Sequence, residues 1–291
     1  MKKRLMAAAF VLMSLAVNGQ DKFLVAGTSS ANIAIVDKDT KSVEWIFSGV
    51  NKEVKECNSL IYLDGGNVAY TYKKGAYMVS SEGDVLWSYK VNEGEEMQSI
   101  SIIKGGYMLG IAGNPMRIVE LDKNWEPKRE ITFDTGVENI HRQFRQMAKT
   151  KRGTYLLPIS FSKRIVELDA TGAILKDIHL DQSSLYVTTD KKGDWIATTG
   201  HSGDIYKINA KSGELSIIVS GKDLGDGIKI EFGAGIAELK NGNYMLTNWV
   251  GHNGDQSQPI LIELTPEGEV VWSMNKLPEL IFAAAIFPIS R

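Results

Sequence analysis

The sequence contains very little cysteine: Cys57 is the only one among 291 residues. No intrachain disulfide can therefore form, and we interpret this thiol as a small core residue rather than a nucleophile. Proline is also scarce, and no Pro/Ser-rich linker divides the chain. No stretch sustains a helical period. These absences exclude a disulfide-stapled scaffold and a helical fold, and they favour one domain stabilised by its core.

Motifs of several enzyme classes are missing as well. The chain has no Gly-x-Ser-x-Gly elbow, no Walker loop, no His-Glu-x-x-His pair and no Cys pair. A basic excess is also missing, since 33 Lys and Arg stand against 35 Asp and Glu. We therefore expect neither nucleic acid nor an anionic membrane as partner, because both require basic patches.

The first twenty residues differ from the rest. Three basic residues at 2–4 precede an apolar run at 5–17, and small residues follow up to Gly19. This order predicts a signal peptide at 1–19 and export to the periplasm or the exterior. The run is too short for a membrane span. An exported chain without disulfides suits a bacterial envelope or exterior.

The remaining chain repeats one unit. A glycine two positions before an apolar or aromatic residue recurs at steps of 39, 48, 40 and 49 residues. Each glycine is followed by three short strand-like runs and preceded by one, with a Gly-containing turn between the last two. Four strands in about 45 residues is the size of a propeller blade, and we name them A to D with A innermost. The repeated glycines are Gly66, Gly105, Gly153, Gly193 and Gly242.

The two ends of the chain complete each other. The repeat starts in phase at a strand B, residues 23–26, and ends with a spare strand A at 280–288. Joining them makes one full blade and leaves no free sheet edge. The sequence therefore predicts an all-β, six-bladed β-propeller over residues 20–291. Each blade has four antiparallel strands, and the C-terminal strand A closes the ring beside the N-terminal strands B, C and D.

Two short motifs recur within this repeat. The segments 42–45, 83–87 and 268–272 each run from Ser or Gly through Val to Trp, and residues 167–172 read Glu-Leu-Asp-x-x-Gly. The pattern resembles the repeat of quinoprotein-like and arylsulfotransferase-like β-propellers. The resemblance implies a propeller in which the tryptophans pack between blades. Arylsulfotransferases of this kind use histidine and arginine near the channel. Quinoprotein dehydrogenases hold a quinone, but they are larger, and no calcium and quinone constellation is evident here, so we predict no cofactor.

The strand order assigns different loops to the two faces of the ring. The A–B and C–D loops are short and charged, whereas the B–C and D–A loops on the other face are longer. Long loops on one side of a rigid scaffold are where binding usually occurs. We therefore predict that the B–C and D–A face is the working face. All four histidines map to it: His141, His179, His201 and His252.

His141 and Arg142 are the candidate catalytic residues, because they lead into strand A of blade four, close to the channel. Imidazole can act as acid, base or nucleophile, and a guanidinium clamps carboxylate, sulfate or phosphate. The alternative is structural: Arg142 pairs with a carboxylate of a blade, and His141 caps a loop.

Five further residues are candidates for ligand binding. Trp249 is either an exposed platform for a flat ligand such as a sugar ring or a plug between blades. A three-histidine metal site of His141, His201 and His252 has no support from spacing, so we predict no metal. The ligand-binding candidates are Arg145, His201, Trp249, His252 and Asn253.

Two functions follow from these residues. We expect a monomeric binding scaffold that holds a small anionic or carbohydrate-like ligand, or a protein partner, at the channel mouth. The alternative is an enzyme at the same place, an arylsulfotransferase-like transferase, a lyase or a glycosidase, which uses His141 and Arg142. Glycosidase chemistry needs two carboxylates. Four acids fall near the start of strands A: Glu56, Glu96, Glu231 and Glu279.

Overall fold

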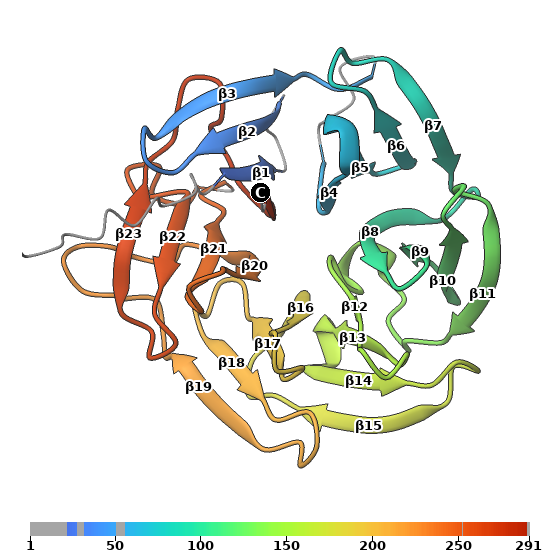
Figure 1. Ribbon diagram of the computed structural model, residues 1–291. Helices are drawn as coiled ribbons and strands as arrows, with labels where there is room; N and C mark the ends of the chain where they lie inside the picture. The colour runs from blue at the N-terminus through green and yellow to red at the C-terminus, as the bar shows by residue number, and fades with distance from the viewer. Residues whose placement is uncertain (1–21, 28–31, 51–55, 252, 290–291) are drawn as a thin grey trace, which may run out of the picture.

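A computed structural model describes residues 22–27, 32–50, 56–251 and 253–289. Within them, six four-stranded antiparallel sheets stand around a central axis (Figure 1). The predicted six-bladed β-propeller is confirmed. The predicted signal peptide at 1–19 lies outside the described residues and stays a prediction.

Each blade runs outward from strand A to strand D. Blade one contains β24 (Ala285–Ile289), β1 (Lys22–Ala26), β2 (Ile33–Asp37) and β3 (Ser42–Phe47). Blade two contains β4 (Leu60–Tyr62), β5 (Val68–Tyr72), β6 (Gly75–Val79) and β7 (Val85–Lys90). Blade three contains β8 (Glu96–Ile103), β9 (Gly106–Ala112), β10 (Met116–Asp122) and β11 (Pro127–Phe133).

The other three blades follow the same order. Blade four contains β12 (Ala148–Lys149), β13 (Tyr155–Ile159), β14 (Arg164–Leu168) and β15 (Ile174–His179). Blade five contains β16 (Tyr186–Thr189), β17 (Trp195–Thr198), β18 (Ile205–Ile208) and β19 (Leu215–Val219). Blade six contains β20 (Gly233–Glu238), β21 (Tyr244–Asn248), β22 (Leu261–Leu264) and β23 (Val270–Met274).

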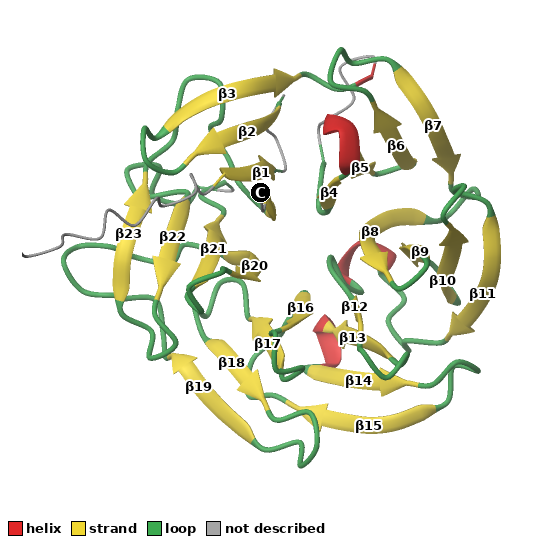
Figure 2. Cartoon of the chain, viewed as in Figure 1, coloured by secondary structure: helices red, strands yellow, loops and turns green. Residues whose placement is uncertain are grey.

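The helical content of these ranges is limited to short 3-10 turns between strands (Figure 2). They are η2 (Asp64–Gly66), η3 (Ile140–Arg142) and η4 (Ser160–Ser162). In the described part of the chain, no helix has the length and apolar character required to cross a membrane.

Burial explains the order of strands within a blade. The middle strands β2 and β14 are almost completely buried, because a neighbouring blade covers each face of the sheet. The outermost strand β3 alternates between exposed and half-buried residues, with the period of two that a half-buried strand requires. A nearly continuous apolar run is therefore a strand B or C, and an alternating run is a strand D.

The repeated glycines have one conformational cause. They lie in the A–B turns of blades two to six, and their φ angles fall between 86° and 92°. This left-handed region strains any residue with a Cβ. The turn that joins strands A and B therefore imposes the glycine spacing seen in the sequence.

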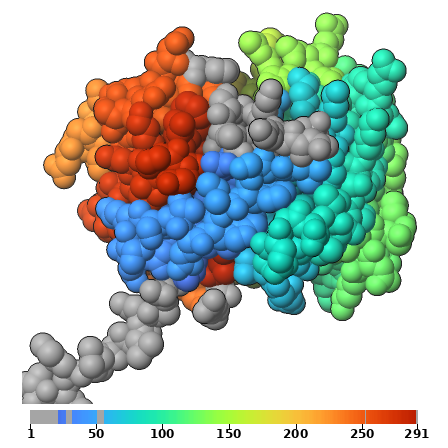
Figure 3. Space-filling model, turned by 90° about the horizontal axis from the view of Figure 1, so that it is seen from above, coloured from blue at the N-terminus to red at the C-terminus, as the bar shows by residue number. Residues whose placement is uncertain are grey.

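The ring closes as predicted. β24 pairs antiparallel with β1, with Ala285 opposite Ala26 and Ile289 opposite Lys22. In Figure 3 the blue strands of blade one lie between red C-terminal segments and the cyan segments of blade two. β1 is therefore paired along both edges, by β24 on one side and by β2 on the other, and leaves no free sheet edge.

The core lies between blades, and the tryptophans of strand D contribute to it. Trp45 donates its Nε1 hydrogen to Ser81 O of the next blade at 2.9 Å. The Trp87 ring lies 4.8 Å from that of Trp125 in blade three, and Trp272 packs against the cluster between blades six and one. All three are partly buried, as expected for residues that dock one blade on the next.

Strand A of blade four is short. It consists of β12 alone, because η3 and the residues after it turn away from the strand direction. Gln143 and Phe144 are fully buried. This segment is therefore a buried turn that carries side chains to the channel mouth.

Candidate functional site

A pocket of about 840 Å³ opens at the channel mouth, on the face formed by the B–C and D–A loops. We call it the mouth pocket. Its charged residues come from the segments that lead into blades two and four, and most of its aromatic residues come from loops of blades four to six. Its lining includes Glu56, Asn58, His141, Arg142, Arg145, Phe161, Tyr186, His201, Phe232 and Trp249.

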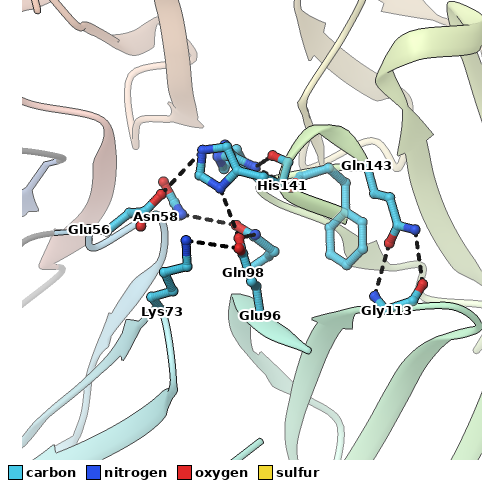
Figure 4. A network of polar contacts seen from close by, with 10 residues as sticks. Glu56, Asn58, Lys73, Glu96, Gln98, Gly113, His141 and Gln143 are labelled. Carbon is cyan, nitrogen blue, oxygen red and sulfur yellow. Dashed lines mark hydrogen bonds and ion pairs between the residues drawn. The ribbon is translucent and has the colours of Figure 1, made fainter. Parts of the chain in front are cut away.

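Gln143 fixes the turn that presents the candidate catalytic residues. Its Nε2 donates to the carbonyls of Gly113 and Val137, both at 2.9 Å. Its Oε1 accepts from the backbone N–H of Gly113 at 3.1 Å. Figure 4 shows Gln143 paired with Gly113 beside His141. Because Gln143 is fully buried, it anchors η3 to blade three and leaves His141 and Arg142 at the pocket surface.

The imidazole of His141 is held through its Nδ1. That nitrogen lies 2.8 Å from Oε2 of Glu96, the first residue of β8. The other oxygen of Glu96 lies 2.9 Å from Nζ of Lys73, and Gln98 donates to the same carboxylate at 3.2 Å. Figure 4 shows this network of contacts around Glu96.

Glu96 is ionised in this network. Burial by itself raises the pKa of a carboxyl, but the hydrogen bonds from His141 and Lys73 outweigh it and lower the pKa of Glu96 to about 2. An ionised carboxylate only accepts hydrogen bonds, so Nδ1 of His141 carries the proton. In the neutral form of the ring the lone pair is then on Nε2, as in other carboxylate–histidine pairs.

Two charged groups approach Nε2 of His141 from different sides. Nη2 of Arg145 lies 2.9 Å away and donates to the lone pair. Oε1 of Glu56 lies 3.5 Å away. Arg145 also donates from Nη1 to the carbonyls of His141 and Phe144. The side chain of His141 as a whole is 44% exposed at the pocket wall.

Arg142 differs from Arg145 in having no such contacts. It is exposed on the pocket wall, and its guanidinium has no hydrogen bond or ion pair with any residue the structure describes. The alternative in which Arg142 pairs with a blade carboxylate therefore has no support in the structure. A free guanidinium beside a pocket is a ready anion receptor.

Aromatic rings form another part of the wall. The rings of His201 and Phe232 meet edge to face at 4.8 Å, and Phe232 meets Trp249 in the same way at 5.6 Å. Trp249 is 7% exposed, so most of its ring packs against neighbouring residues and little of it is available to stack on a ligand. Phe161 in η4 is 71% exposed at the rim of the pocket. These rings suit a flat apolar group.

Comparison with proteins of known structure identifies the family. A protein of unknown function from Bacteroides caccae is 30% identical, with a TM-score of 0.85 over 94% of this chain and the whole of the other. The chain belongs to the same family as this Bacteroides caccae protein. No family profile and no curated protein matches the sequence.

Other structures share the fold of this Bacteroides caccae family at lower identity. A streptogramin B lyase is 13% identical with a TM-score of 0.60, over 93% of this chain and 88% of the other. A catalytically inactive histidine-to-alanine variant of virginiamycin B lyase from Staphylococcus aureus, with quinupristin, is 15% identical with a TM-score of 0.54, over 77% and 71%. These likenesses support the propeller fold. The resemblance to quinoproteins and arylsulfotransferases stays a prediction.

The mouth pocket brings together most of the predicted site residues of this family member. Both catalytic candidates and three of the binding candidates line it. Asn253 does not line it, and His252 lies outside the described residues. His179 ends the outer strand β15 with a 75% exposed side chain, away from the pocket. The predicted site residues that line the mouth pocket are His141, Arg142, Arg145, His201 and Trp249.

The role of Glu96 is the main feature that sequence reasoning missed. The sequence places four acids near the starts of strands A, and the structure brings two of them, Glu56 and Glu96, to the His141 ring, with one acid at each nitrogen. Lys73 and Phe232 were not predicted at all. The available signal for Glu96 was its place near the start of a strand A, the strand that lines the channel.

Two buried groups near the pocket stay protonated. Burial raises the pKa of the Cys57 thiol to about 12, which fits a core residue and not a nucleophile. Burial likewise raises the pKa of Tyr186 to about 12, so its hydroxyl keeps its proton at the pocket wall. Among the described residues, no group of three His, Cys, Asp or Glu side chains is arranged to hold a metal ion.

Proposed function

We propose that this protein is an exported binding propeller whose mouth pocket holds a small molecule with one anionic group and a flat apolar body. The observation that carries the proposal is the combination of the free guanidinium of Arg142 with the ring wall of His201, Phe232 and Trp249 in one pocket. A volume of about 840 Å³ lies in the range of small-molecule sites.

Binding of simple probes to the mature chain tests this function. Benzoate carries both a carboxylate and a ring, and benzamide is its neutral isostere. We expect benzoate to raise the melting temperature in a concentration-dependent way, because a ligand that binds only the native state stabilises it. Benzamide should raise it much less. Equal shifts for the two compounds, or none for either, would contradict an anion-binding pocket.

The pairing of His141 with Glu96 favours a second candidate, an enzyme. In a lyase, Nε2 takes a proton from a C–H group of the ligand, and the electron pair of that bond forms a π bond as the bond to the leaving group breaks. The leaving group takes the electrons of the broken bond and receives the proton from the imidazolium. Glu96 stabilises the imidazolium, and the arginines hold the anionic part of the substrate. The lyases among the proteins of similar fold motivate lyase substrates as the first panel, followed by aryl sulfates and glycans.

Comparing the wild type with His141→Gln, for both turnover and benzoate binding, distinguishes the enzyme from the binding propeller. His141→Gln should abolish turnover on any compound the wild type converts, while benzoate still binds. Turnover that survives His141→Gln would reject His141 as the catalytic base, and a wild type that converts no compound of the panel would reject the enzyme. Neither outcome affects the binding function.

A further inference from the structure

Arg145 is hydrogen-bonded to Nε2 of His141, the ring nitrogen that would exchange a proton with a ligand in the mouth pocket. Its Nη2 donates to Nε2 at 2.9 Å, and its Nη1 bonds two backbone carbonyls of the same turn. Among the described residues, the hydrogen bonds of Arg145 go to neutral acceptors and none goes to a carboxylate. A guanidinium pairs more strongly with an anion, often through two parallel hydrogen bonds, so an incoming anion can compete for Arg145.

The charges around His141 are balanced without a proton on Nε2. Glu56 and Glu96 supply two negative charges, and Lys73 and Arg145 supply two positive charges. Arg142 adds a further positive charge at the pocket surface. An anion that enters the pocket shifts this balance and competes with Nε2 for the hydrogens of Arg145.

We infer that Arg145 is a ligand-released cap on His141: it blocks Nε2 while the pocket is empty, and the anionic group of the ligand draws it away. Nε2 then faces the ligand and Glu56, ready to take up a proton. This inference rests on the proposed anion-binding function and adds a regulatory role for a residue that otherwise looks like a second clamp. Arg145 is a positioning residue, since it acts through His141.

The test uses the Nε2 resonance of [¹⁵N]histidine-labelled protein, assigned by its loss in His141→Gln. In the ligand-free wild type, we expect an unprotonated nitrogen that accepts a hydrogen bond. Arg145→Met should shift this resonance without any ligand, and Arg142→Met should not, because Arg142 does not contact the ring. If Arg145→Met does not fold, Arg145→Lys serves, since an ammonium lacks the planar fork that places Nη1 at the backbone carbonyls and Nη2 at Nε2.

Benzoate added to the wild type should shift the Nε2 resonance in the same direction as Arg145→Met does, and benzamide should leave it in place. If pocket amides report benzoate binding while the Nε2 resonance stays fixed, or if Arg145→Met leaves it unchanged, the cap is wrong and the binding function stands. If the amide spectrum shows no benzoate binding, the proposed function fails, and ligand-triggered release fails with it.

Discussion

The carboxylate of Glu96 lies 2.8 Å from Nδ1 of His141, although 45 positions separate them in the chain. Glu96 begins the innermost strand of blade three, and His141 stands on the turn that leads into blade four. The closed ring brings these two positions to one mouth of the channel. The contact fixes the tautomer of the imidazole and thereby decides which nitrogen faces the pocket.

Glu96→Gln should change the acid stability of the protein. The pKa of Glu96 is lowered from 4.5 to about 2 in the folded state. Its stabilising contribution is therefore complete above pH 4.5 and is lost as the pH falls toward 2; it amounts to roughly 3 kcal/mol. Urea unfolding at several pH values between 6 and 2 should show the wild type losing stability more steeply than the variant.

The matched control for that measurement is Glu44→Gln. Glu44 pairs with Lys22 on the surface and is 38% exposed, and exposed ion pairs contribute about 0–1 kcal/mol. This variant should follow the pH dependence of the wild type. Parallel curves for Glu96→Gln and the wild type would show that Glu96 is not held as an ion in the native state.

His141→Gln should leave the fold intact while it removes any proton transfer. The side chain is 44% exposed, and Glu96 keeps its contacts with Lys73 and Gln98 when the ring is gone. We expect a melting temperature close to that of the wild type, measured by circular dichroism. A large drop would mean that His141 is primarily a structural cap, the alternative considered from the sequence.

Arg142→Met should weaken anion binding selectively. A charge-assisted hydrogen bond contributes about 1.5–3 kcal/mol, so the Kd for benzoate should rise roughly 10- to 100-fold by calorimetry. The melting temperature should not change, because Arg142 is exposed and bonds to no described residue. The affinity for benzamide is the internal control, and an equal loss for both compounds would point to a packing defect.

Two Phe→Ala substitutions separate the core from the pocket rim. Phe23 is 1% exposed between blades one and six, so its truncation should cost about 3–5 kcal/mol in urea unfolding. Phe161 is 71% exposed, and its truncation should change stability by no more than about 0.5 kcal/mol while weakening benzoate binding. A stability loss of similar size at both positions would contradict this division.

The sequence alone predicted much of the architecture, because local backbone chemistry repeats in each blade. The glycines of the A–B turns have φ near 90°, and this requirement is visible as a regular spacing. Alternation distinguishes an outer strand such as β3 from a buried one such as β2. The surplus strand at the C-terminus and the missing one at the N-terminus gave the blade count.

The candidate site was predicted only as a face of the molecule and a set of residue types. Whether His141 meets Glu96, Glu56 or Arg145 depends on how a buried turn is pinned by Gln143, and no local pattern encodes that. The same holds for Trp249, whose burial depends on the ring of Phe232.

There is a physical reason why the architecture was predictable from the sequence and the contacts of the site were not. Strand period, turn glycines and apolar content are properties of neighbouring residues, so the sequence by itself determined a closed ring of six blades and the face that carries long loops. The partners of a side chain at the channel mouth come from blades far apart in the chain. Only the tertiary structure decided that Glu96 holds the imidazole of His141, that Arg145 covers its free nitrogen and that Arg142 is unpaired in the described structure.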